Sequence, residues 1–179
     1  MHSEINIYTD GSKYTDYVGS GFVIYRFNKV LYKGEYKLPK TSSIFQAEIA
    51  AIREAIRYIK ENVTCKYIRF FVDSQAAILA LSSREVTSLL VLTTINELNK
   101  AAEDIKIIIN WTKAHIGTVG NEVADTLAKA GAKSGVTLKI GLLRSELKKR
   151  VESLFYAKWE RRFTKYKGCL LYTSPSPRD

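Results

Sequence analysis

The chain has 179 residues, which is enough for one domain with a hydrophobic core and a short appendage. It is 46% hydrophobic and 26% charged, a balance that excludes disorder over the whole length. The net charge is +10 and no apolar run approaches the roughly 20 residues of a membrane helix, so we expect a basic protein without a membrane partner.

The positive charge is concentrated towards the carboxyl terminus. Residues 1–137 hold 17 basic and 14 acidic residues, whereas residues 138–168 hold 10 basic and 3 acidic ones. This imbalance favours a polyanionic partner, although a basic surface without any partner gives the same composition. The isolated cysteines Cys65 and Cys169 and the lack of a signal-peptide pattern predict an intracellular protein, in the cytoplasm or nucleus.

The first third of the chain has the periodicity of strands followed by a helix. Alternating apolar residues predict strands at 4–10, 19–27 and 29–37, and a tight hairpin at Asn28 joins the last two. A helical pattern then extends from Ile44 to Asn62, and the Thr-Ser-Ser run before it offers helix caps.

The remainder alternates between helix and strand. We expect a strand at 66–73, helices at 74–82 and 87–103, a strand at 105–112, and a helix at 118–133 that Gly135 ends. Strands reached through helical crossovers run parallel. The order therefore predicts an α/β fold with a five-stranded mixed sheet, antiparallel in its first three strands and then parallel, flanked by helices.

Four carboxylates occupy positions where an acid is unusual. Glu48 lies on the stripe of its helix that faces the sheet, unless it is an end-of-helix residue near solvent or pairs with Arg53 or Arg57. Asp10 and Asp73 each end an apolar strand, where a lone Asp would normally indicate a turn.

The fourth acid, Asp125, follows the loop GTVG at 117–120, which lets its helix cross the sheet. Functional groups gather at the carboxyl ends of parallel strands, so these acids are expected to meet there. Several carboxylates stay ionised together only with positive charge between them. Hard oxygen ligands favour Mg²⁺, and two such ions suit a phosphoryl displacement.

Four segments resemble the ribonuclease H family, type 1: YTDGS, QAEIAAI, FVDSQ and KAHIGTVGNEVADTLAK. The similarity covers about residues 5–133, and its most specific part is the His-x-Gly-x-x-Gly-Asn-Glu-x-Ala-Asp run. The longer segments IFQAEIAAI and WTKAHIGTVGNEVADTLAKAGA look closest to the ribonuclease H domain of reverse-transcriptase polyproteins from non-LTR retrotransposons.

The resemblance implies an RNase H-like fold with the 30–37 strand at one edge of the sheet. It also implies an endonuclease that cuts the RNA strand of RNA–DNA hybrids with two Mg²⁺ ions, for which Mn²⁺ can substitute. By position, Asp10, Glu48, Asp73 and Asp125 match the metal-binding carboxylates of the family. His115 matches its loop histidine, which assists proton transfer or product release.

Contacts with the RNA strand are implied in the same way, since 2′-hydroxyl groups distinguish RNA from DNA. The residues concerned are Gly11, Ser12, Gln46, Ser74, Gln75, Asn121 and Glu122. The expected partners are an RNA–DNA hybrid and a reverse-transcriptase domain in the same polyprotein, and the isolated domain is expected to be a monomer.

Residues 138–167 predict a basic amphipathic helical extension to a catalytic domain at 1–137. Its apolar stripe contains Leu143, Leu147, Val151, Leu154, Phe155, Trp159 and Phe163. The favoured interpretation is that this stripe docks on the domain or on a neighbouring part of a longer polyprotein. The alternative is an arm whose basic residues contact phosphates. Residues 168–179 end in CLLYTSPSPRD, which resembles translated adaptor sequence, so we expect a non-native or disordered tail.

Two other functions suit the same fold. One is a nucleic-acid-binding module without catalysis, which the presence of all four acids disfavours. The other is a different nuclease or a transposase, which the His-x-Gly loop followed by the Asn-Glu-x-Ala-Asp helix disfavours. The sequence therefore predicts a hybrid-specific ribonuclease.

Overall fold

The structure, a computed structural model, describes residues 4–113, 119–141 and 144–165. The chain divides into two units, Met1–Leu142 and Leu143–Asp179, each of which is described by itself. His115 was predicted as a site residue, and it lies outside the described residues.

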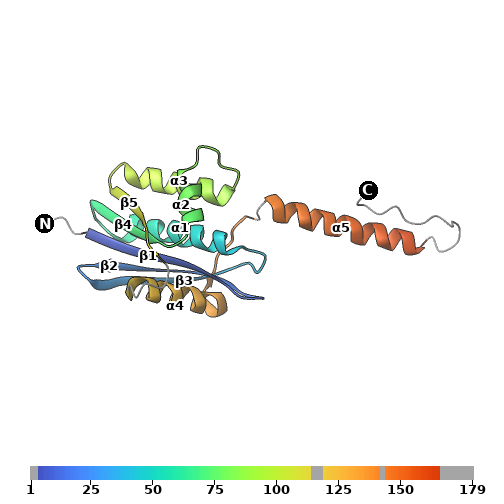
Figure 1. Cartoon of the computed structure of the whole chain (residues 1–179), viewed down its shortest axis with the longest axis horizontal. Helices are drawn as coiled ribbons and strands as arrows, with labels where there is room; N and C mark the ends of the chain where they lie inside the picture. The colour runs from blue at the N-terminus through green and yellow to red at the C-terminus, as the bar shows by residue number, and fades with distance from the viewer. Residues whose placement is uncertain (1–3, 114–118, 142–143, 166–179) are drawn as a thin grey trace. The chain divides into compact units, whose positions relative to one another are not determined.

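One mixed sheet forms the centre of the first unit (Figure 1). Its strands are β1 (Glu4–Lys13), β2 (Val18–Arg26), β3 (Lys29–Leu38), β4 (Tyr67–Val72), β5 (Lys106–Trp111) and β6 (Val136–Thr137). They lie in the order β5-β4-β1-β2-β3-β6. β1, β2 and β3 pair antiparallel, and β1, β4 and β5 pair parallel, which confirms the predicted mixed sheet.

The sheet has six strands rather than the predicted five. The added strand, β6, pairs in parallel with Tyr36 and Lys37 of β3. The 30–37 strand was expected at one edge of the sheet, but β6 occupies that edge. After the helix at Val119–Ser134 ends, the chain passes along β3, whose backbone groups on that side are free to pair with another strand.

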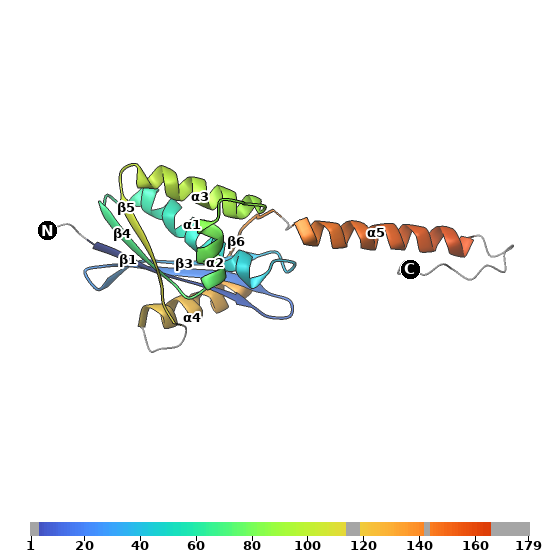
Figure 2. The same cartoon turned by 45° about the horizontal axis from the view of Figure 1, so that its top comes forward.

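Helices cover both faces of the sheet (Figures 1 and 2). On one face lie α1 (Ile44–Asn62), α2 (Gln75–Ser82) and α3 (Leu89–Ala102), and on the other lies α4 (Val119–Ser134). The main core is formed between the first face and α1, where Ile7, Phe22, Ile52, Ile56 and Phe70 are fully buried. This burial follows from the predicted alternation of β1 and the helical period of α1.

The approach of α4 to the sheet depends on glycines in β2. A Cβ atom at Gly19 would lie 2.0 Å from the carbonyl oxygen of Ala128, and one at Gly21 would lie 2.3 Å from its nitrogen. Any side chain at either position would push α4 away. The backbone of α4, which carries Asp125, is therefore held directly against β2.

The segment after α4 belongs to the first unit. The Leu138 N–H donates to the carbonyl of Lys37 (2.8 Å), and Leu138 and Ile140 pack against a buried cluster that includes Leu38 and Ala47. The amide Nε2 of Gln46 donates to the carbonyl of Gly141 (3.1 Å). We call residues 136–141 the strap. The helix expected from residue 138 begins only at Arg144, because the apolar side chains of the strap pack into the core in extended backbone.

The second unit contains α5 (Arg144–Lys165). Large apolar side chains are exposed along it: Leu147, Val151, Leu154, Phe155, Tyr156 and Trp159. The sequence of α5 holds eight basic and three acidic residues. Within the described residues, no helix is both long and apolar enough to span a bilayer.

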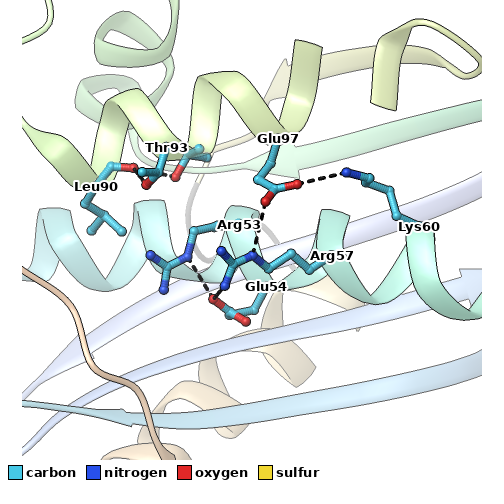
Figure 3. Close-up of polar contacts among 8 residues, drawn as sticks. Arg53, Glu54, Arg57, Lys60, Leu90, Thr93 and Glu97 are labelled. Carbon is cyan, nitrogen blue, oxygen red and sulfur yellow. Dashed lines mark hydrogen bonds and ion pairs between the residues drawn. The ribbon is translucent and has the colours of Figure 1, made fainter. Parts of the chain in front are cut away.

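An ion-pair network joins α1 to α3 (Figure 3). Glu97 of α3 accepts from Lys60 Nζ at 2.9 Å and lies 3.6 Å from Arg57 Nε. Arg57 also contacts Glu54 at 3.4 Å, and Glu54 accepts from the largely buried Arg53 at 2.8 Å. The hydrogen bond from Lys60, together with the charges of Lys60 and Arg57, lowers the pKa of Glu97.

We predict that Glu97→Gln lowers the free energy of unfolding by about 0.5–1 kcal/mol at pH 7, as expected for a network of partly exposed ion pairs. Because the pKa of Glu97 is lower in the folded state, ionised Glu97 stabilises the fold at pH values above its ordinary pKa of 4.5. This stabilisation is lost as pH falls through the pKa of the folded state. Urea unfolding at pH 7 and pH 3 measures the difference, which should disappear at pH 3. Equal losses in Glu97→Gln and in Glu103→Gln, a change at an exposed residue after α3, would contradict it.

Truncation of the chain at two points measures how much the strap contributes to the stability of the first unit. A chain that ends at Gly141 retains the described contacts of the first unit and is the reference. A chain that ends at Gly135 should lose about 1–3 kcal/mol, because β6, two apolar side chains and the bond from Gln46 are removed. Equal stability of the two truncated chains in urea would show that the strap contributes nothing.

Candidate active site

Asp10 and Asp73 are brought together by the register of two parallel strands. Thr9 of β1 and Val72 of β4 form the last pair between these strands, so the residues that follow them, Asp10 and Asp73, lie side by side where the pairing ends. Asp10 remains within β1 opposite Gly21, whereas Asp73 follows the last residue of β4 and directly precedes the cap of α2, Ser74.

Glu48 reaches the same place from α1. A capping box formed by Ser43 and Gln46 starts this helix, which puts Glu48 in its second turn. The side chain is buried, and its Oε1 accepts a hydrogen bond from the Gly11 N–H at 3.0 Å. Its Oε2 is also buried and has no hydrogen-bond partner among the described residues. The solvent-facing and Arg-paired alternatives for Glu48 are thus both excluded.

The three carboxylates form one cluster. One oxygen from each of Asp10, Glu48 and Asp73 lies within 4.8 Å of the others. The pKa of Asp10 is raised to about 7, mainly because the carboxyl group is buried and further because of the charges of Asp73 and Asp125. The pKa of Glu48 is raised well above its ordinary value, mainly because of burial and further because of the charges of Asp10 and Asp73. The cluster can therefore be fully ionised at neutral pH only when a cation compensates it.

Asp125 lies beside this cluster without being part of it. Its charge raises the pKa of Asp10, and its Oδ2 pairs with Lys129 Nζ at 2.6 Å, one helical turn further along α4. Lys129 was not among the site residues predicted from the sequence. The four-residue spacing of an acid and a base on one helix would have been the signal.

The residues expected to contact RNA have different environments. Gly11 and Ser12 lie in β1 beyond Asp10, Gln75 is exposed at the start of α2, and Glu122 is exposed in the first turn of α4. The Oγ of Ser74 accepts from the Ala77 N–H at 3.2 Å as the cap of α2.

Two of the expected RNA contacts are partly or wholly covered. Asn121 has a buried Oδ1 without a partner among the described residues. The side chain of Gln46 is buried, and its two polar atoms bond with the Ser43 N–H and the Gly141 carbonyl. A contact between Gln46 and RNA would require one of these bonds to break.

Trp111 is a second residue beside the cluster that was not predicted from the sequence. It is the last residue of β5, its side chain is 51% exposed, and its indole Nε1–H donates to the carbonyl of Asp73 at 3.0 Å. Nothing in the sequence pattern indicates this bond, because it depends on the register of β4 against β5.

Comparison with known proteins is consistent with this geometry. RNase H1 from the halophilic archaeon Halobacterium salinarum NRC-1 has the same fold, with a TM-score of 0.58 at 17% identity over 72% of this chain and 96% of that chain. A search of curated proteins found no match. A family model described as RNase H matches residues 2–133, the segment that carries all four acids. The match covers most of the chain, and the chain therefore belongs to the RNase H family.

Proposed function

We propose that the protein is an endonuclease that hydrolyses the RNA strand of RNA–DNA hybrids, with Asp10, Glu48, Asp73 and Asp125 as ligands for two Mg²⁺ ions. The observation that carries the proposal is the convergence of three carboxylates from β1, α1 and the end of β4 within 4.8 Å. Membership of the RNase H family supports the reaction and the substrate class.

The donor set fits a hard divalent cation. Every side chain in the cluster offers carboxylate oxygen, the ligand type that Mg²⁺ prefers, and Mn²⁺ accepts the same ligands. The buried Oε2 of Glu48 has no other partner among the described residues, so an ion would satisfy it. When bound, divalent ions stabilise the charge that develops during phosphodiester hydrolysis.

Other residues have supporting roles around the cluster. The Gly11 amide fixes one oxygen of Glu48 and leaves the other for the ion. Lys129 partly neutralises Asp125 and keeps that carboxylate at the rim of the cluster. His115 is proposed to assist proton transfer, and Gly11, Ser12, Ser74, Gln75, Asn121 and Glu122 are proposed to face the nucleic acid.

The wider context is also part of the proposal. The motif similarity supports a place beside a reverse transcriptase in a retroelement polyprotein, which would put the protein inside the cell. The basic, apolar surface of α5 supports either docking on a neighbouring domain or contact with phosphates. The salt dependence of hybrid affinity, compared between the full chain and a chain ending at Gly141, separates the two roles.

We predict that the purified protein with Mg²⁺ cuts the RNA strand of a labelled hybrid and leaves duplex RNA and duplex DNA intact. Asp10→Asn should lower the cleavage rate by at least about 100-fold, because one ligand oxygen loses its charge. Asp104→Asn, the same change at an exposed residue remote from the cluster, should cut at the wild-type rate. Hybrid that stays uncut in both Mg²⁺ and Mn²⁺ while still bound would assign a binding module instead.

A second prediction concerns stability without metal. Because the folded pKa of Asp10 is about 7 and its ordinary value is 3.8, its contribution to stability is fully present below about pH 4 and lost as pH rises past 7. In EDTA at pH 8, Asp10→Asn should therefore be more stable than the wild type by about 1–2 kcal/mol.

Thermal unfolding at pH 5 and pH 8, with EDTA or with Mg²⁺, measures this effect. Mg²⁺ should raise the unfolding temperature of the wild type at pH 8 and should have much less effect on Asp10→Asn. A variant that is less stable than the wild type in EDTA at pH 8 would show that the carboxylates do not repel one another in the folded state.

A further inference from the structure

Asp73 differs from the other clustered acids in the support of its backbone. Asp10 lies within β1 and Glu48 lies within α1, so regular hydrogen bonding holds both main chains. Asp73 lies between the end of β4 and the start of α2. Pairing of β4 with both of its neighbours stops one residue earlier, at Val72.

Trp111 continues the hydrogen bonding beyond the last strand pair. Val72 and Trp111 are the final partners of β4 and β5, and the Thr112 N–H donates to the carbonyl of Val72 at 2.9 Å. Asp73 follows β4, and the indole Nε1–H of Trp111 donates to its carbonyl at 3.0 Å. A side chain of β5 thus bonds to the backbone of Asp73 just beyond the point where regular strand pairing ends.

A hold on Asp73 matters because of where its side chain lies. When they are ionised, the carboxylates of Asp10, Glu48 and Asp73, whose oxygens lie within 4.8 Å, repel one another, which favours movement of the member with the least regular backbone. A carboxylate that has moved away must be brought back before an ion can bind, and this cost reduces the affinity for the ion.

Packing alone does not account for the position of Trp111. The side chain is 51% exposed at the end of an edge strand, so it adds little to the core. Its polar atom is the part that makes a specific long-range contact, between residues 38 positions apart.

We propose that Trp111 is a positioning residue that holds Asp73 in metal-binding geometry through its indole N–H. This inference rests on the proposed function, because it assumes that Asp73 is a metal ligand. Trp111 acts through the main chain of Asp73 and is not itself a ligand.

The test uses Trp111→Phe, which keeps an aromatic ring and removes the donor. Titration calorimetry with Mg²⁺ in the absence of nucleic acid should show an affinity about fivefold weaker than that of the wild type, the size expected for one hydrogen bond. The Mg²⁺ concentration for half-maximal hybrid cleavage should rise by a similar factor. The rate at saturating Mg²⁺ should stay within about twofold of wild type, since the bound ion then holds Asp73 in place.

Trp159→Phe is the matched control, because Trp159 lies in α5 and is the only other tryptophan of the chain. It should bind Mg²⁺ as the wild type does. It also leaves Trp111 as the sole tryptophan, so the emission of Trp111 should change on Mg²⁺ addition with the midpoint found by calorimetry. This second measurement does not require Trp111→Phe to fold.

The outcomes separate the inference from the function on which it rests. A wild type that binds no Mg²⁺ and cuts no hybrid overturns the proposed function and the inference together. A normal wild type with unchanged Mg²⁺ affinity in folded Trp111→Phe overturns the inference alone. Emission from Trp111 that does not respond to saturating Mg²⁺ has the same consequence. A lower rate at saturating Mg²⁺ with unchanged affinity also overturns it, and would assign Trp111 to substrate contact.

Discussion

The repulsion among three converging carboxylates is the constraint on which the site depends. Asp10, Glu48 and Asp73 lie within 4.8 Å of one another, and Glu48 is almost completely removed from water. Such an arrangement opposes folding unless a cation or protons compensate it, so the surrounding structure must hold it in place. The strand register, the hydrogen bond from Gly11 to Glu48 and the close packing of α4 on β2 all contribute to this hold.

The means of support differ among the acids and follow from the fold. The rigid centre of the sheet carries Asp10, and the longest helix of the first unit, buried along one side, carries Glu48. Asp73 lies at a junction between a strand and a helix, where local side-chain bonds replace the ladder. Asp125 lies on α4, on the opposite face of the sheet, and its carboxylate is paired with Lys129. The four acids are thus carried by a strand, by two helices and by a junction between a strand and a helix.

Much of this arrangement could be predicted from the sequence, because it depends on local periodicity. Alternation in β4 indicated that Asp73 lies at the strand end, and the helical period of α1 placed Glu48 towards the sheet. The same reasoning was wrong for Asp10, because β1 continues past it to Lys13. Bonds between distant segments could not be predicted in this way. Residues 138–141 of the strap were interpreted as the start of a helix, although the apolar stripe on which that helix was predicted begins only at Leu143. The burial of the strap depends on a partner cluster more than 80 residues earlier. The contact of Gln46 with Gly141 was missed for the same reason.

The position of the strap also bears on how nucleic acid would be recognised. Gln46 was expected to face RNA, yet its amide bonds with Gly141 and its oxygen completes the cap of the helix that carries Glu48. A side chain engaged on both sides stabilises the start of α1 and therefore the position of Glu48, which lies two residues later. Its role in hybrid cleavage would then be indirect, through the geometry of the metal ligand. Direct contacts would come from groups that remain exposed around the carboxylates, such as Gln75 and Glu122. Selection of RNA over DNA would in that case depend on the starts of α2 and α4, because the start of α1 is engaged in positioning Glu48.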